Sequence, residues 1–319
     1  MNEFEIIKKY LKPLTQNNKA ALELKDDIFF NYKNKIVLSL DTYVEGVDFI
    51  NSKKPKLFLK KVLRSALSDL YAKGVKPKNY FLSFSVKKNI ISKTWLSSVK
   101  NVLFKEQKKY DISLSGGDIS SSSQFIITVI VLGYSNFKPI LRDGAKKNDD
   151  IYLTGNLGNS FIGLCVIKKK INLGKYNNFF KNHYYEPKIQ HKFSNHLNQI
   201  ASSSIDLSDG LHQDLSHICR NSKFGATINI NSLPLSNIVK SLLKQKRLNL
   251  FKIFSRGDDY QILFTSHKKN RSKIARLSKL TGTKVTRIGF IKKKRKIDFL
   301  NNGIKIKFNP KNLGYIHKF

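Results

Sequence analysis

The stretch from Ser203 to Asp214, which reads SSIDLSDGLHQD, constrains the fold of this 319-residue chain more than any other. Its first residues alternate between polar and apolar side chains, and this pattern predicts a β-strand. Gly210 then interrupts the strand pattern, and from Leu211 onward the apolar residues return at helical spacing. The sequence therefore predicts a strand-to-helix corner that carries Asp206 and Asp209.

This corner has two interpretations. Carboxylates held at a turn are typical ligands of a hard divalent cation, because oxygen ligands suit such an ion. The same residues also suit a purely structural role, because Ser208 or Asp209 can cap the helix that follows. The corner alone does not decide between a metal site and a helix cap.

The net charge of the chain is +37, from 59 Lys and Arg against 22 Asp and Glu. Such an excess attracts polyanions, including nucleotides, nucleic acids and acidic membranes. The basic residues are spread along the whole sequence, which is typical of a solvated lysine coat, and no DNA- or RNA-binding motif accompanies them. A nucleic-acid-binding protein is therefore kept only as an alternative, and it would bind with a steep salt dependence and no response to Mg²⁺.

The sequence predicts a soluble cytoplasmic protein that is not inserted in a membrane. The N-terminal residues lack the apolar region of a signal peptide. The longest apolar run, residues 125–132, is far too short to cross a bilayer. Cys165 and Cys219 have neither disulfide nor zinc spacing, so we expect free thiols in a reducing compartment.

The length predicts about two domains, at roughly 150 residues each. We expect an N-terminal domain over residues 1–137 and a C-terminal domain over residues 138–319. Within the first domain, residues 55–73 have the apolar stripe of a helix, with Asp69 at the edge of the stripe. Gly116 and Gly117 precede Asp118 and are expected to form a turn that brings backbone amides close to an anion.

The aspartates follow one pattern along the chain. Ten of the 22 acidic residues fall at predicted strand ends, glycine-rich turns or the edge of a buried helix. They are Asp26, Asp27, Asp41, Asp69, Asp118, Asp206, Asp209, Asp214, Asp258 and Asp259. We expect them to converge on one cavity, where divalent cations would relieve the repulsion among the carboxylates. Several carboxylates, several Mg²⁺ ions and anion-binding turns are typical of phosphoryl transfer.

The motifs that carry these aspartates resemble those of the thiamine-monophosphate kinase family, which belongs to the aminoimidazole ribonucleotide synthetase-like superfamily. The resemblance covers nearly the whole chain, through DD at 26–27, SLDTYVEGVDF at 39–49, LSDLYAKG at 67–74, SGGD at 115–118, IDLSDGL at 205–211 and GDDYQILF at 257–264. It implies an α/β fold with two domains: an N-terminal α/β domain whose sheet pairs across a homodimer, and a C-terminal α+β domain.

The resemblance also implies roles for individual residues. The Mg²⁺ ions would be bound by Asp27, Ser39, Asp41, Asp69, Asp118, Asp206 and Asp209. ATP, the co-substrate, would contact Gly117, Asp118, Arg142 and Ser208, and thiamine monophosphate would contact Asp48, Asp258 and Tyr315. The implied reaction is in-line transfer of the γ-phosphoryl group of ATP to thiamine monophosphate, giving thiamine diphosphate.

The sequence departs from the family pattern at Lys25, Asp48, Ala66 and Arg256. Asp48 and Arg256 lie in or near the substrate part of the pattern, whereas every expected metal carboxylate is present. Another ATP-dependent synthetase or kinase of the same superfamily is therefore an alternative, and analysis of the reaction product would distinguish the two.

Overall fold

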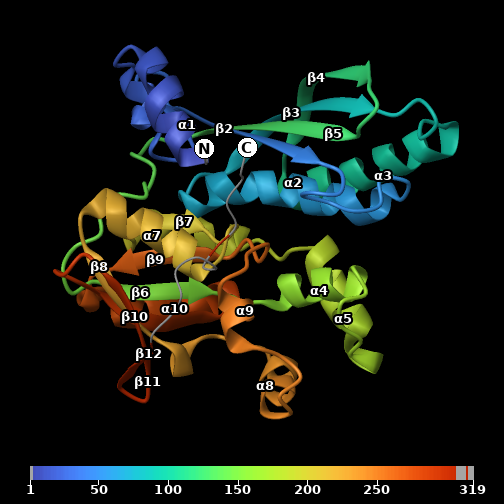
Figure 1. Cartoon of the computed structure of the whole chain (residues 1–319). Helices are drawn as coiled ribbons and strands as arrows, with labels where there is room; N and C mark the ends of the chain where they lie inside the picture. The colour runs from blue at the N-terminus through green and yellow to red at the C-terminus, as the bar shows by residue number, and fades with distance from the viewer. Residues whose placement is uncertain (1–2, 307–313, 315–319) are drawn as a thin grey trace.

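Two β-sheets form the framework of the chain (Figure 1). The computed structural model describes residues 3–306 and residue 314. The strands of the first sheet lie between residues 29 and 134, and those of the second between residues 150 and 306. The structure thus has the mixed α/β architecture that the sequence predicts.

The first sheet has the strand order β1-β2-β5-β3-β4, in which β3 and β4 are parallel and the other neighbours antiparallel. Its strands are β1 (Phe29–Asn31), β2 (Ile36–Val44), β3 (Pro77–Val86), β4 (Ser113–Ser121) and β5 (Ile126–Tyr134). Helices α2 (Pro55–Ala72) and α3 (Lys93–Tyr110) pack on one face of this sheet. Every second residue of β2 and β5 points to these helices and is buried. The residues between them, such as Leu40 and Ile130, point to the other face of the sheet.

The expected turn at Gly116 and Gly117 is wrong, because β4 runs through both residues as a continuous strand. The glycines serve a different purpose. A Cβ atom on Gly117 would lie 2.0 Å from the carbonyl oxygen of Leu82 on β3. The register between β3 and β4 shifts just before this point, so the two backbones approach too closely for a side chain.

The second sheet has the order β12-β11-β8-β10-β6-β9-β7 and is antiparallel except for β11 and β8. Its strands are β6 (Asp150–Thr154), β7 (Ser203–Asp206), β8 (Gly225–Asn229), β9 (Ile262–Ser266), β10 (Val285–Lys292), β11 (Ile297–Asn301) and β12 (Ile304–Ile306). The predicted corner is confirmed, because β7 ends at Asp206 and the next helix begins at Leu211.

The remaining helices surround the second sheet or begin the chain. They are α1 (Glu3–Ile6), α4 (Asn159–Ile167), α5 (Asn177–Tyr185), α6 (His191–Ser194), α7 (Leu211–Ser222), α8 (Asn237–Lys244), α9 (Leu250–Phe254) and α10 (Arg271–Thr281). Between α1 and β1 lie a π-helix (Ile7–Leu11) and 3-10 turns at Lys12–Thr15 and Lys19–Leu24. Short 3-10 turns also occur at Gly174–Tyr176, Leu197–Gln199, Ile230–Ser232 and Lys268–Asn270.

Helix α2 lies between the two sheets (Figure 1). It packs on β2 and β5 of the first sheet and on β7 of the second. Ser68 on α2 donates a hydrogen bond to Asp206 on β7, and the Ser194 hydroxyl donates one to the carbonyl of Tyr71. The residues of α2 therefore stand where both sheets meet. Across residues 3–306, no helix combines the length and hydropathy needed to cross a membrane.

Candidate active site

One face of α2 carries a buried polar row at a spacing of four residues, formed by Lys61, Ser65 and Asp69 and continued by Lys73, the residue that caps the C-terminal end of the helix. This spacing places the four side chains one above another along the helix. Each is buried, although the helix is otherwise an apolar core element. Asp69 was the only member of this row that we expected at the site; the regular spacing of four is the sequence signal that identifies the others.

Three carboxylates from separate elements converge beside this row. Asp27 precedes β1, Asp69 lies on α2 and Asp206 ends β7, and one oxygen atom from each lies within 4.8 Å of the other two. Asp69 accepts a hydrogen bond of 2.5 Å from the Ser39 hydroxyl, and Asp206 accepts one of 2.7 Å from Ser68.

Burial and repulsion from neighbouring carboxylates raise the pKa values of Asp69 and Asp206 in this cluster, and of Asp41 and Asp209 beside it. Burial, with the Asp27 charge, raises the pKa of Asp206 to about 7. Burial, with Asp206 and Asp27, raises the pKa of Asp209 to about 7, and burial with Asp27 and Asp48 raises the pKa of Asp41 to about 6. Burial followed by Asp41 and Asp206 raises the pKa of Asp69 well above its usual value.

The donor set of this cluster fits Mg²⁺. All the converging ligand atoms are carboxylate oxygens, the type that a hard cation prefers. One buried oxygen of Asp27, Oδ2, has no hydrogen-bond partner within the described part of the chain. A divalent cation among these groups would be coordinated by that oxygen. It would also neutralise the repulsion that raises the pKa values of the neighbouring carboxyl groups.

The cluster forms part of the wall of a cavity of about 1670 Å³. Eight aspartates line this cavity: Asp26, Asp27, Asp41, Asp48, Asp69, Asp206, Asp209 and Asp258. Ser208 also lines it, and so do exposed basic side chains that include Lys168, Lys252 and Arg256. Glu3, Ile7 and Leu11 of the N-terminal segment form another part of the wall. A buried acidic cluster beside exposed cations matches a ligand composed of metal ions and phosphate groups.

Arg142 connects the cluster to the segment between the two sheets. Its guanidinium donates a hydrogen bond to Asp27, and its backbone N–H donates one of 2.7 Å to Asp26. Although burial opposes the charge, Asp27 and Asp26 raise the pKa of Arg142 above its usual value. The guanidinium therefore stays charged next to the carboxylates.

Residues 256–261 form a tightly held loop opposite the predicted corner. The Asp258 N–H donates to the Ser208 carbonyl at 2.9 Å, and a Cβ atom on Gly257 would lie 1.5 Å from that same oxygen. Asp258 and Tyr260 adopt positive φ angles of 71° and 49°, a backbone conformation that costs free energy for L-residues and that the surrounding contacts hold in place.

Within this loop, Asp258 faces the cavity and Asp259 does not. The Asp258 carboxylate is paired with Lys61 of α2, whose ammonium lies 4.4 Å from the ring centroid of Tyr184 and 5.1 Å from that of Tyr260. Asp259 accepts hydrogen bonds from the backbone N–H groups of Gly158 and Ser160, so it caps the start of α4.

Two of the expected site residues lie away from the cavity within one chain. Gly117 and Asp118 are exposed on β4, at the edge of the first sheet opposite β1. The strand registers place Asp118 three strand spacings from Thr42, or about 14 Å across the sheet. Tyr315 lies outside the described residues.

The comparisons agree with this architecture. Residues 18–135 match the family described as AIR synthase related protein, N-terminal domain. The chain is 38% identical to the thiamine-monophosphate kinase of Buchnera aphidicola from Schizaphis graminum, over 99% of this chain and 98% of that protein. The chain belongs to the thiamine-monophosphate kinase family. The Escherichia coli thiamine-monophosphate kinase is 30% identical over 84% of both chains.

Solved structures of thiamine-monophosphate kinases have the same fold as this chain over most of its length. AaThiL complexed with AMPPCP and TMP has a TM-score of 0.84 at 24% identity, covering 99% of this chain and 97% of its own. The thiamine-monophosphate kinase from Stenotrophomonas maltophilia has a TM-score of 0.77 at 25% identity, covering 91% and 96%. Both sheets and the helices between them therefore follow the family fold.

Proposed function

We propose that this protein is a thiamine-monophosphate kinase, which uses ATP and Mg²⁺ to convert thiamine monophosphate into thiamine diphosphate. The convergence of Asp27, Asp69 and Asp206 in a large cavity carries this proposal. Carboxylates from three distant segments meet where a metal-bound triphosphate could lie. Relatives that span the chain are named for the same activity, and AaThiL binds AMPPCP and TMP.

The reaction forms a bond between an oxygen of the acceptor phosphate and the γ-phosphorus, and breaks the bond from that phosphorus to the β-phosphate oxygen. ADP leaves with the electron pair. The acceptor oxygen is already anionic near neutral pH, so this chain needs no strong base. Mg²⁺ ions, when bound, would neutralise the charge that opposes the approach of the two phosphates.

In this proposal the protein holds the metals and orients the two phosphates. Asp27, Ser39, Asp41, Asp69, Asp206 and Asp209 would bind Mg²⁺, and Arg142 and Ser208 would contact ATP. Ser39 lies beside the cluster and donates to Asp69, and Arg142 contacts the same group of carboxylates. A planar guanidinium suits a phosphate because it can donate two parallel hydrogen bonds.

The thiamine end of the substrate is assigned to Asp48, Asp258 and Tyr315. Asp48 and Asp258 lie on the cavity wall, which supports their assignment. The pairing of Asp258 with Lys61 offsets part of its charge. We therefore expect hydrogen bonding and aromatic contact, as well as attraction between opposite charges, to hold the substrate there.

We further propose a homodimer with an N-terminal domain at 1–137 and a C-terminal domain at 138–319. Leu40 is 56% exposed on the face of the first sheet that points away from α2 and α3. A second copy seated on this face would cover its apolar side chains. It would also bring Gly117 and Asp118 of the partner subunit toward the cavity, which these residues do not reach within one chain.

The two cysteines in the described part of the chain are free, which supports a reducing compartment, and we propose the cytoplasm.

The decisive experiment measures ADP release by the purified chain at millimolar Mg²⁺, with and without thiamine monophosphate, and identifies the product by mass spectrometry. We expect ADP and thiamine diphosphate in equal amounts, and no release once the metal is chelated. ADP release that ignores thiamine monophosphate, or a different phosphorylated product, would contradict the proposal.

A further inference from the structure

The two adjacent aspartates that precede β1 have different surroundings. Asp27 belongs to the carboxylate cluster and keeps one buried oxygen without a hydrogen-bond partner among the described residues. Both oxygens of Asp26 are instead occupied by donors from the protein. Oδ1 accepts from the Asp27 N–H at 3.0 Å and contacts the Lys73 ammonium at 2.8 Å, and Oδ2 accepts from the Arg142 N–H at 2.7 Å.

Lys73 is the last member of the polar row on α2, and its side chain is 0% exposed. Besides Asp26, its ammonium donates a hydrogen bond of 3.0 Å to the carbonyl of Ser204 on β7. Lys73 follows Asp69 by one helical turn, and Ser204 precedes Asp206 by two residues on the same strand. The Lys73 ammonium therefore contacts the segments that carry Asp27 and Asp206, and Lys73 itself caps the end of the helix that carries Asp69.

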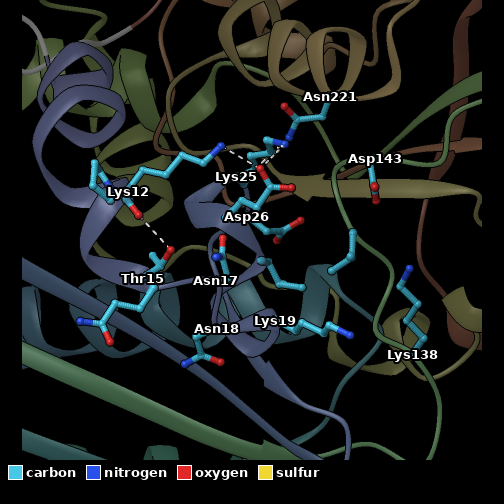
Figure 2. Close-up of a pocket in the computed structure, with 15 residues that line it drawn as sticks. Lys12, Thr15, Asn17, Asn18, Lys19, Lys25, Asp26, Lys138, Asp143 and Asn221 are labelled. Atoms are coloured by element: carbon cyan, nitrogen blue, oxygen red, sulfur yellow. Dashed lines mark hydrogen bonds and ion pairs between the residues drawn. The ribbon is translucent and has the colours of Figure 1, made fainter.

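Figure 2 shows Asp26 on the wall of a second cavity, of about 730 Å³, which Lys12, Lys25, Lys138 and Asn221 also line. Asp26 lines the large cavity as well, so it separates the two spaces. Its side chain is nevertheless only 3% exposed. A buried carboxylate needs partners, and Lys73 is its one charged partner among the ion pairs of the described residues.

We propose that Asp26 and Lys73 form a buried clamp that positions the metal cluster without binding the metal. This inference rests on the proposed function, since it concerns the geometry of the same site. Asp26 fixes the backbone of Asp27 and Arg142, while Lys73 fixes β7 two residues before Asp206. Both are positioning residues, because their polar atoms are bonded to protein groups that in turn carry the site residues.

The test compares Lys73→Met, Asp26→Asn and the double variant with the wild-type chain. The first readout is the Mg²⁺ concentration that gives half of the metal-dependent rise in Tm, which requires no turnover. The second is the division of any kinetic change between KM for ATP and kcat. We expect each single variant to raise the Mg²⁺ midpoint by about 10- to 100-fold, the usual effect of losing an outer partner of a metal ligand.

The double variant separates positioning from simple stability. Removing both charges leaves no unpaired buried ion, so Tm without metal should recover relative to the single variants. The Mg²⁺ midpoint should stay high, because no ion pair then joins the segments. If both Tm without metal and the Mg²⁺ midpoint recovered in the double variant, the proposal would be wrong, and Asp26 and Lys73 would form only a structural ion pair.

Arg64 and Glu106 supply the matched control. They form a buried bidentate pair between α2 and α3, with distances of 2.7 and 2.8 Å, and neither lines the large cavity. Glu106→Gln should lower Tm but leave the Mg²⁺ midpoint unchanged. Wild-type midpoints in Lys73→Met and Asp26→Asn would overturn the inference, whereas no Mg²⁺-dependent stabilisation of the wild-type chain would contradict the proposed function itself.

Discussion

Asp27, Asp69 and Asp206 share one cluster, but each is held by different contacts. The Ser39 hydroxyl donates a hydrogen bond to Asp69, and the Ser68 hydroxyl donates one to Asp206. These two carboxylates are therefore oriented by neighbours that carry no charge. Asp27 is oriented by Arg142 and by the backbone contact of its own N–H with Asp26. Neutral donors fix a carboxylate without competing with a metal for its charge, which suits a ligand that must also bind a cation.

Replacing Asp206 by Asn changes one carboxylate of the cluster into a neutral amide of nearly the same shape. We expect turnover to fall by at least about 100-fold, the order of loss when one preorganised electrostatic group is removed. The amide oxygen can still accept the Ser68 hydrogen bond, and a neutral group there avoids repulsion from Asp27, so Tm without metal should not fall. Steady-state kinetics and thermal unfolding measure the two effects, and unchanged turnover would contradict the assignment.

The raised pKa values predict how stability depends on pH. Burial first, then neighbouring carboxylates, raises the pKa of Asp206 and Asp209 from 3.8 to about 7. The folded chain thus binds these protons more tightly than the unfolded chain. The associated stability is present below pH 3.8 and is lost as the pH rises through 7. Mg²⁺ replaces the protons, so the difference in Tm between Mg²⁺ and EDTA should grow between about pH 5 and pH 8.

Subtracting the EDTA curve from the Mg²⁺ curve removes the titration of groups far from the site. The Asp206→Asn variant serves as the control, and its Tm difference should be smaller and less dependent on pH. A wild-type difference that stays constant over the whole range would contradict the titration of the cluster.

At the scale of elements, α2 and the loop at 256–261 determine the shape of the site together. Lys61 of α2 pairs with Asp258 in the loop, and Asp69 of α2 belongs to the carboxylate cluster. The two residues lie two helical turns apart on one face of the helix. The loop is held by backbone hydrogen bonds to residues 207 and 208 and by two positive φ angles. The strain at Asp258 and Tyr260 persists because the surrounding contacts leave no other conformation.

Gly257→Ala tests this loop. The added methyl group would meet the Ser208 carbonyl at 1.5 Å, so the loop must move away from the corner. We expect a loss of about 1–3 kcal/mol in stability, typical of overpacking, and a large rise in KM for thiamine monophosphate. Gly174→Ala is the control, because it adds strain at a φ of 59° with no atom nearby. Its KM should be unchanged even though stability falls by about 1–2 kcal/mol.

The sequence was sufficient to predict the strand-to-helix corner, the helix over α2 and the convergence of seven of the ten aspartates, because these follow from local periodicity and from the placement of scarce acidic residues. The other three, Asp118, Asp214 and Asp259, do not line the large cavity. It did not predict Lys61 or Lys73 as site residues, because a lysine within a helix is usually exposed and the chain is rich in lysine. It also assigned Gly116 and Gly117 to a turn, since a glycine pair is ambiguous until the neighbouring strand is known. Only tertiary packing against Leu82 explains Gly117.

At the scale of the whole molecule, the face of the first sheet that points away from α2 and α3 carries partly exposed apolar side chains. Leu38 pairs with Leu132 and Leu40 with Ile130 across β2 and β5, so apolar side chains form rows on this face. Tyr134 at the end of β5 is 57% exposed. A surface of this kind on an otherwise highly charged protein indicates a binding partner, and we propose a second copy of the chain.

Ile130→Lys should disrupt this dimer. The residue lies in the middle of the row between Leu40 and Phe81, where a charge would be buried without a partner on association. Sedimentation velocity should show the wild-type chain as a dimer and the variant as a monomer, with lower activity but a folded structure. Ile304→Lys is the control, because Ile304 is 73% exposed on β12 of the other sheet. A wild-type monomer with full activity would contradict the proposal.

The acidic interior of the large cavity has a consequence for regulation in the cell. A free nucleotide carries several negative charges and would meet buried carboxylates of the same sign, whereas its magnesium complex would not. Activity should therefore follow the ratio of magnesium to nucleotide rather than the total amount of either. When nucleotide exceeds magnesium, the surplus would withdraw the ion from the carboxylates and slow the enzyme.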